Sequence, residues 1–133
     1  MDHVNIAAED AGTLASIFGD VLGLEVVEEC VVEEQGVKVV KLGAGETVVE
    51  ITEPLGPDTP VGRFLAKRGP GIHHLAFEVP DLAAKLRELK TAGIRLVDEE
   101  PRIGAGGHRI AFVHPAVFGG ILVELTEKHR SGD

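Results

Sequence analysis

The chain has 133 residues, which is enough for one compact domain with a hydrophobic core. Its composition, 44% hydrophobic and 26% charged residues, is typical of a globular protein and excludes a disordered chain. The net charge of −9 disfavours a nucleic-acid partner because an acidic surface repels phosphate backbones. No apolar run is long enough to span a membrane, and no segment resembles a signal peptide. The single cysteine, Cys30, cannot form an intramolecular disulfide, and we expect a cytoplasmic protein.

The first half of the chain carries signals for one strand, one helix and three further strands. The helix is predicted to follow Asp10 and to end at Gly23. Its apolar positions are spaced by three and four residues, which predicts one buried helical face. These positions are Leu14, Ile17, Phe18, Val21 and Leu22. The predicted strands lie at 2–8, 24–32, 37–42 and 47–52.

The second half repeats this order after a connector rich in Pro and Gly. The connector leads into a short helix that begins near Pro60. In the second half, Asp81 is the predicted N-cap of a helix that stops before Gly93. This helix turns three leucines inward, namely Leu82, Leu86 and Leu89. The predicted strands lie at 72–79, 95–97, 109–113 and 121–126.

Two short motifs occur once in each half. Asp2-His3-Val4 in the first half corresponds to His73-His74-Leu75 in the second, and Val49-Glu50-Ile51-Thr52-Glu53 corresponds to Val123-Glu124-Leu125-Thr126-Glu127. The sequence therefore predicts an α+β fold of two tandem βαβββ modules that form a curved mixed sheet. We expect a single domain over 1–133, with module 1 at about 1–56, the connector and short helix at about 57–70, module 2 at about 71–127 and a polar tail at 128–133.

The repeated motifs predict a metal site. Side chains alternate between the faces of a strand, so the apolar neighbours of His3 and His74 face the helices and leave both imidazoles on the inner face. Glu50 and Glu124 take the same position in the last strand of each module. A buried carboxylate is costly unless its charge is offset, and a shared divalent cation would offset both. Imidazole and carboxylate ligands suit Mn, Fe, Co, Ni or Zn.

These motifs resemble those of the methylmalonyl-CoA epimerases of the glyoxalase/vicinal-oxygen-chelate superfamily over nearly the whole chain. The more specific segments are Glu34-Gln35-Gly36-Val37 and Gly71-Ile72-His73-His74-Leu75-Ala76-Phe77. The resemblance implies inversion at C2 of an acyl-CoA substrate, methylmalonyl-CoA, and a homodimer. It also implies one divalent metal held by His3, Glu50, His74 and Glu124, with Co²⁺ favoured and Mn²⁺, Ni²⁺ or Zn²⁺ as alternatives.

The resemblance assigns the acid/base roles to Glu34 and Glu124, with Glu33 as the alternative to Glu34. Two departures stand out. Some relatives have Gln in place of Glu50, and many have Lys-Ser where this chain has Ala116-Val117-Phe118.

Three other functions remain open on the same scaffold. A glyoxalase I-type lactoylglutathione lyase would use a similar site of four ligands. An extradiol dioxygenase needs two His and only one carboxylate, so Glu50 together with Glu124 disfavours it. A small-molecule binding protein of this superfamily would need no metal.

Overall fold

The structure is a computed structural model that describes residues 1–104 and 107–127. Predictions that concern Ala105, Gly106 and the polar tail at 128–133 lie outside the described residues. The chain divides into two compact units. One unit is His3–His73, and the other comprises Met1–Asp2 and the chain from His74 onward.

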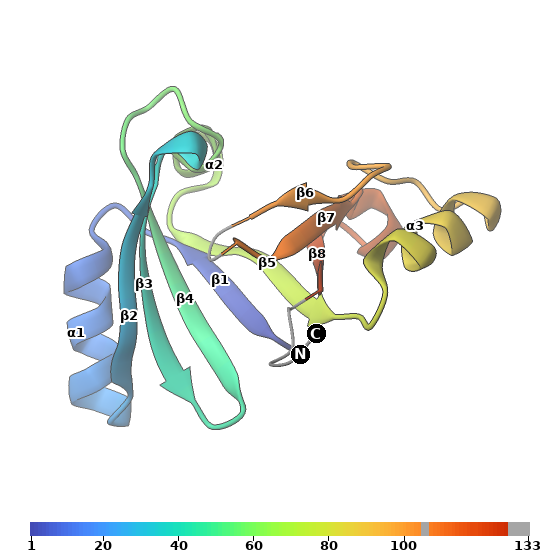
Figure 1. Cartoon of the computed structure of the whole chain (residues 1–133). Helices are drawn as coiled ribbons and strands as arrows, with labels where there is room; N and C mark the ends of the chain where they lie inside the picture. Colours follow the sequence, from blue (N-terminus) through green and yellow to red (C-terminus); the bar gives the residue numbers. More distant parts are fainter. Residues whose placement is uncertain (105–106, 128–133) are drawn as a thin grey trace. The chain divides into compact units, whose positions relative to one another are not determined.

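The first unit is a four-stranded sheet with two helices. The strands follow the spatial order β2-β3-β4-β1, with β1 parallel to β4 and the other pairs antiparallel. Helix α1 packs on β3 and β4, and Figure 1 shows it running along one side of these strands, next to β2 in this view. The elements are β1 (His3–Ala7), α1 (Ala11–Leu22), β2 (Glu25–Val32), the 3₁₀ helix η1 (Glu33–Gln35), β3 (Val37–Ala44), β4 (Thr47–Pro54) and α2 (Pro60–Arg68).

Within the second unit the same plan recurs, with the strands in the order β5-β8-β7-β6. Strand β5 is parallel to β8, whereas β8–β7 and β7–β6 are antiparallel. The elements are β5 (Gly71–Glu78), α3 (Leu82–Thr91), β6 (Arg102–Ile103), β7 (Arg109–Val113), the 3₁₀ helix η3 (Pro115–Phe118) and β8 (Val123–Glu127). The prediction of two βαβββ modules in an α+β fold is therefore confirmed.

The same capping pattern starts the first helix of each unit. The carboxylate of Asp10 accepts a hydrogen bond from the Thr13 amide, and that of Asp81 accepts one from the Ala84 amide. Asp81 is the N-cap as predicted, and the first helix starts after Asp10 as predicted; each carboxylate satisfies an amide that has no partner within its helix. A second carboxylate binds each helix start, because Glu53 accepts from the Ala11 amide and Glu127 from the Leu82 amide, both at 2.9 Å. The last Glu of each repeated motif thus ties the end of a strand to the helix of its own module.

The predicted buried face of α1 is only partly correct. Leu14 and Phe18 pack on the core, but the most buried positions of the helix are Ala11 and Ala15. Small alanine side chains let the helix approach the sheet closely, so the contact stripe is centred on them. The remaining three predicted positions are exposed, namely Ile17, Val21 and Leu22.

The predicted strand at 95–97 is wrong. Leu96 makes only an isolated bridge to Val113, and the edge strand of this sheet is β6. Between the two, the Asp98 side chain accepts a hydrogen bond from the Phe112 amide at 2.8 Å and takes the place of a backbone partner. Pro101, which has no amide hydrogen, precedes β6 directly.

Each unit has its own hydrophobic core between the sheet and the helix. In the first unit, Val40, Leu42 and Ile51 pack with Ala11 and Ala15. In the second, the predicted inward residues Leu82 and Leu86 are fully buried against β7 and β8, and Leu89 packs beside them. Complete burial of one such leucine contributes about 1.5–3 kcal/mol. None of the helices in the described part of the chain has the length and apolar character to cross a membrane.

Candidate metal centre

His3 and Glu50 form a buried pair in the first unit. His3 lies on β1 and Glu50 on the neighbouring parallel strand β4. The side-chain face opposite α1 carries both residues, as strand alternation predicts. They are only 8% and 9% exposed, and His3 Nε2 lies 3.7 Å from Glu50 Oε1.

His74 and Glu124 form the equivalent pair in the second unit. They lie on β5 and β8, are each 6% exposed, and His74 Nε2 lies 3.6 Å from Glu124 Oε1. Phe112, which pairs with Glu124 across β7 and β8, contacts the His74 ring edge-on with a centroid distance of 5.4 Å. The structure therefore places all four predicted ligands in the interior and brings them together within each unit as a His–Glu pair.

Both pairs have the chemistry of metal ligands. The distances of 3.6 and 3.7 Å between nitrogen and oxygen are too long for a hydrogen bond. Two ligand atoms on one ion, each about 2.1 Å from it, stand about 3.0–3.4 Å apart, which is close to the observed spacing. A buried carboxylate also needs a compensating positive charge. Each pair thus fits one half of a site with His and Glu ligands.

Glu50 belongs to a row of polar residues that crosses the first sheet. Strand register places Asn5, Glu50, Lys41 and Glu28 side by side on β1, β4, β3 and β2. Lys41 Nζ lies 2.9 Å from Glu28 Oε2. Partial burial opposes the charge of Lys41, but the hydrogen bond to Glu28 and the nearby charge of Glu50 together raise the pKa of its ammonium group.

Sequence reasoning did not identify Lys41 or Asn5 as part of the site. Asn5 alternates with His3 along β1, and this alternation was the one available signal, whereas Lys41 lies on β3, which carries no predicted ligand. Their contacts depend on the register between strands that are far apart in the sequence.

Glu34 lies in η1, and its side chain is exposed, as is that of Glu33. The turn at Gly36, which follows η1, is fixed by close packing and by a backbone hydrogen bond. Gly36 has a φ of +68°, and a Cβ atom at this position would lie 2.5 Å from Cγ2 of Thr59. The carbonyl of Gly36 accepts a hydrogen bond from the Leu55 amide at 2.7 Å. The motif that resembles the family's catalytic segment is therefore anchored to the N-terminus of α2.

His73 packs against the ring of a neighbouring aromatic residue. Its ring meets that of Phe64 edge-on, with centroids 4.8 Å apart, and Arg68 lies over the Phe64 ring. Burial lowers the pKa of His73 below its ordinary value of 6.5, and the charge of Arg68 lowers it further. His73 is therefore a neutral packing residue near pH 7.

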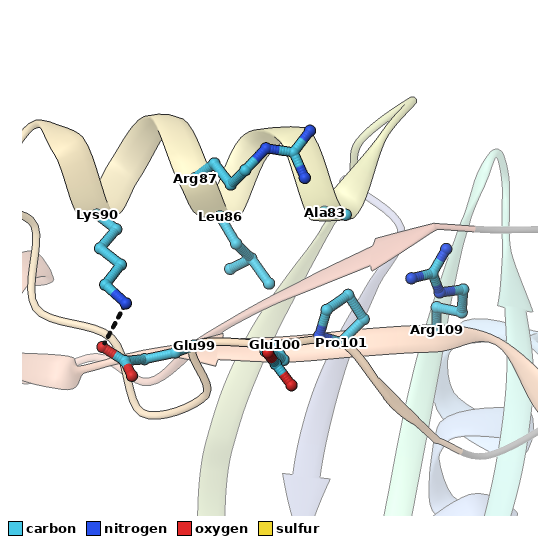
Figure 2. A pocket seen from close by; sticks show the side chains of 8 residues that line it. All are labelled: Ala83, Leu86, Arg87, Lys90, Glu99, Glu100, Pro101 and Arg109. Carbon is cyan, nitrogen blue, oxygen red and sulfur yellow. Dashed lines mark ion pairs between the residues drawn. The ribbon is translucent and has the colours of Figure 1, made fainter.

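Two arginines of the second unit lie on opposite faces of its sheet. Arg109 shares the α3 face with Ala111 and lines a cleft of about 540 Å³, which Figure 2 shows between α3 and residues 99–101. Arg102 shares the opposite face with Phe112 and lies over its ring, 5.4 Å from the centroid. Arg102, not Arg109, is therefore on the face that carries His74.

Comparison with known proteins identifies the family. Residues 2–112 match the model of the Glyoxalase/Bleomycin resistance protein/Dioxygenase superfamily. The chain is 40% identical over 128 residues to the mitochondrial methylmalonyl-CoA epimerase of Mus musculus, covering 96% of this chain and 72% of that protein. It is 39% identical over 129 residues to the ethylmalonyl-CoA/methylmalonyl-CoA epimerase of Cereibacter sphaeroides, covering 96% of both.

A solved structure agrees with these sequence relatives. The fold matches a variant of the Streptomyces coelicolor methylmalonyl-CoA epimerase in complex with 2-nitronate-propionyl-CoA, with a TM-score of 0.90, 36% identity and coverage of 96% of this chain and 93% of that one. The chain therefore belongs to the glyoxalase/bleomycin resistance protein/dioxygenase superfamily and, within it, to the family of the methylmalonyl-CoA epimerases.

Proposed function

We propose that the protein is a metal-dependent methylmalonyl-CoA epimerase, which interconverts the 2R and 2S forms of methylmalonyl-CoA. The observation that carries this proposal is the buried His–Glu pair that recurs in each module. Membership of the epimerase family selects this reaction among those of the superfamily.

The proposed site joins the two pairs around one divalent ion. His3 and Glu50 would supply two ligands, and His74 and Glu124 the other two. Co²⁺ is the ion that we favour, with Mn²⁺, Ni²⁺ and Zn²⁺ as alternatives of suitable ligand preference. When bound, the ion supplies positive charge that stabilises negative charge as it develops on the thioester and carboxylate oxygens of the substrate.

The protein's own groups move the proton. Inversion at C2 requires one group that removes the proton from one face of the planar enolate and a second group that returns a proton to the other. We assign these roles to Glu34 and Glu124. Glu124 is buried beside His74, which fits a group that works in a site shielded from water. The anchored turn at Gly36 fits the fixed placement that Glu34 would need.

The charge of an acyl-CoA requires basic groups outside the metal site. Arg102 supports such recognition because its side chain is half-exposed, lies over Phe112 and shares a face with His74. The guanidinium of Arg102 forms an ion pair with Asp98, with Arg102 Nε 3.4 Å from Asp98 Oδ2. The other N–H groups of the guanidinium can still donate to a ligand.

We further propose a cytoplasmic homodimer. The exposed apolar residues Ile17, Val21 and Leu22 of α1 support self-association through the first module. Strand β2 is the outermost strand in the order β2-β3-β4-β1 and carries exposed valines, namely Val26, Val27 and Val31. Cys30 as the single cysteine supports a reducing compartment.

Proton NMR of methylmalonyl-CoA in heavy water tests the reaction. We expect rapid loss of the C2 proton signal and racemisation with the Co²⁺-loaded protein, and neither after chelation. Formation of lactoylglutathione from methylglyoxal and glutathione, without exchange at C2, would instead show a glyoxalase I-type lyase. A purified protein that binds no metal and exchanges no proton would be a binding protein.

A further inference from the structure

The side chain of Asn5 donates a hydrogen bond to Glu50. Asn5 is 2% exposed and is the Cα partner of Glu50 across β1 and β4. Its Nδ2 donates one hydrogen bond to Glu50 Oε1 at 2.7 Å and another to Thr52 Oγ1 at 2.6 Å. Both hydrogens of the amide nitrogen are thereby used.

The Asn5 amide keeps this orientation although its other end is unsatisfied. Asn5 Oδ1 is buried and has no hydrogen-bond partner among the residues that the structure describes. Rotating the amide by 180° would place Oδ1 against the carboxylate of Glu50, where two acceptors repel each other. A buried acceptor without a partner costs stability, so packing alone is a poor reason for Asn at this position.

The second module has no such amide. Ala76 occupies the position equivalent to Asn5 and is the Cα partner of Glu124. The residue two positions after each glutamate is Thr in both modules, Thr52 and Thr126. On the side of the first strand of each module, the two glutamates therefore differ, because a side-chain donor stands beside Glu50 and a methyl group stands beside Glu124.

We infer that Asn5 is a positioning residue that fixes the carboxylate of Glu50 as a metal ligand. This inference rests on the proposed metal site. A donated hydrogen bond holds the carboxylate in one rotamer and so fixes the direction of its free oxygen lone pairs. Glu50 would thus be held in place as a ligand, whereas Glu124, beside Ala76, keeps the proton-transfer role proposed above.

Titration of the full-length protein with Co²⁺, followed by visible absorption, tests this role. Loss of a hydrogen-bond partner of a metal ligand typically costs 10- to 100-fold in metal affinity. We expect Asn5→Ala, which copies the second module, to weaken Co²⁺ binding by about this factor and to shift the absorption bands of the bound ion. At saturating Co²⁺, turnover should return close to that of the wild-type protein.

Thr52→Val is the matched control, because it removes the other acceptor of the Asn5 amide at similar burial and leaves the bond to Glu50 in place. It should bind Co²⁺ as the wild-type protein does. Asn5→Leu, which fills the volume of the amide, is the second variant in case Asn5→Ala does not fold.

Wild-type affinity and spectrum in the Asn5 variants would overturn the inference. Equal losses in Thr52→Val, or unfolding of both Asn5 variants, would do the same, because they would show a structural role. A wild-type protein that binds no Co²⁺ would instead contradict the proposed function itself.

Discussion

Glu50 and Glu124 are nearly equally buried, yet their surroundings differ. Glu50 has the donor Asn5 on one side and the ammonium group of Lys41 in the register position on the other. Lys41 also binds Glu28, so two glutamates share its charge. The polar row thus places a donor and a cation beside the buried negative charge of Glu50. The neighbours of Glu50, a proposed metal ligand, thus help to set how its carboxylate is oriented and how its charge is balanced.

Glu34 is the residue whose role depends most on the comparison with the family. We expect Glu34→Gln to lower the rate of epimerisation by about 10²–10⁴-fold, because Gln cannot accept or return a proton. Co²⁺ binding should be unchanged, since Glu34 is not among the proposed ligands. Parallel measurements of turnover and Co²⁺ affinity separate the two effects.

Glu33→Gln is the control for this prediction, because Glu33 is the exposed neighbour in the same short helix. It should retain turnover close to that of the wild-type protein. The opposite pattern, a normal rate in Glu34→Gln and a large loss in Glu33→Gln, would move the proton-transfer role to Glu33.

At the scale of elements, the turn after η1 decides where Glu34 can lie. Gly36 requires a left-handed conformation, and a Cβ atom there would collide with Thr59. We expect Gly36→Ala to destabilise the protein by more than the cost of about 1–2 kcal/mol for a left-handed non-glycine residue, because the collision adds to it. Urea unfolding of the variant measures this free energy.

Gly45→Ala is the matched control for the turn. Gly45 has a nearly identical φ of +67°, but a Cβ atom there meets nothing within 4 Å among the described residues. Adding Thr59→Ser to Gly36→Ala should recover part of the loss, because Ser lacks the colliding methyl group but keeps the capping hydroxyl. Equal destabilisation by the two alanine substitutions would show that the contact with Thr59 contributes nothing.

The sequence was sufficient to predict most elements because their signals are local. Strand alternation, helical spacing and the caps Asp10 and Asp81 act within a few residues of one another. The strand expected at 95–97 is reduced to a single bridge, because its backbone pairing with β7 stops where the Asp98 side chain, instead of a backbone carbonyl, accepts from the Phe112 amide. The exposed apolar residues of α1 could not be foreseen, since the rotation of a helix on its sheet depends on the packing of Ala11 and Ala15.

The candidate site was predictable in part, because strand alternation is also a local signal. Alternation places His3, Glu50, His74 and Glu124 on inner faces, and the structure confirms their burial. The bond from Asn5 to Glu50 and the binding of helix starts by Glu53 and Glu127 were missed. They join residues far apart in the sequence, and only the strand register shows which side chains become neighbours.

At the level of the whole molecule, the proposed metal site requires both modules. Each unit has its own core and His–Glu pair, and neither pair alone offers more than two of the proposed ligands. Sites with two protein ligands hold divalent ions weakly compared with sites of three or four. One Co²⁺ ion should therefore bind only when both pairs are present. Two independent weak sites, one in each module, are not expected.

The most direct test of this claim is the number of Co²⁺ ions bound per chain, measured by elemental analysis after dialysis of the wild-type protein and of two double variants. His3→Ala with Glu50→Ala removes the first pair, and His74→Ala with Glu124→Ala removes the second. We predict one ion in the wild-type protein and none in either variant. Two ions in the wild-type protein, with one retained in each variant, would contradict the account.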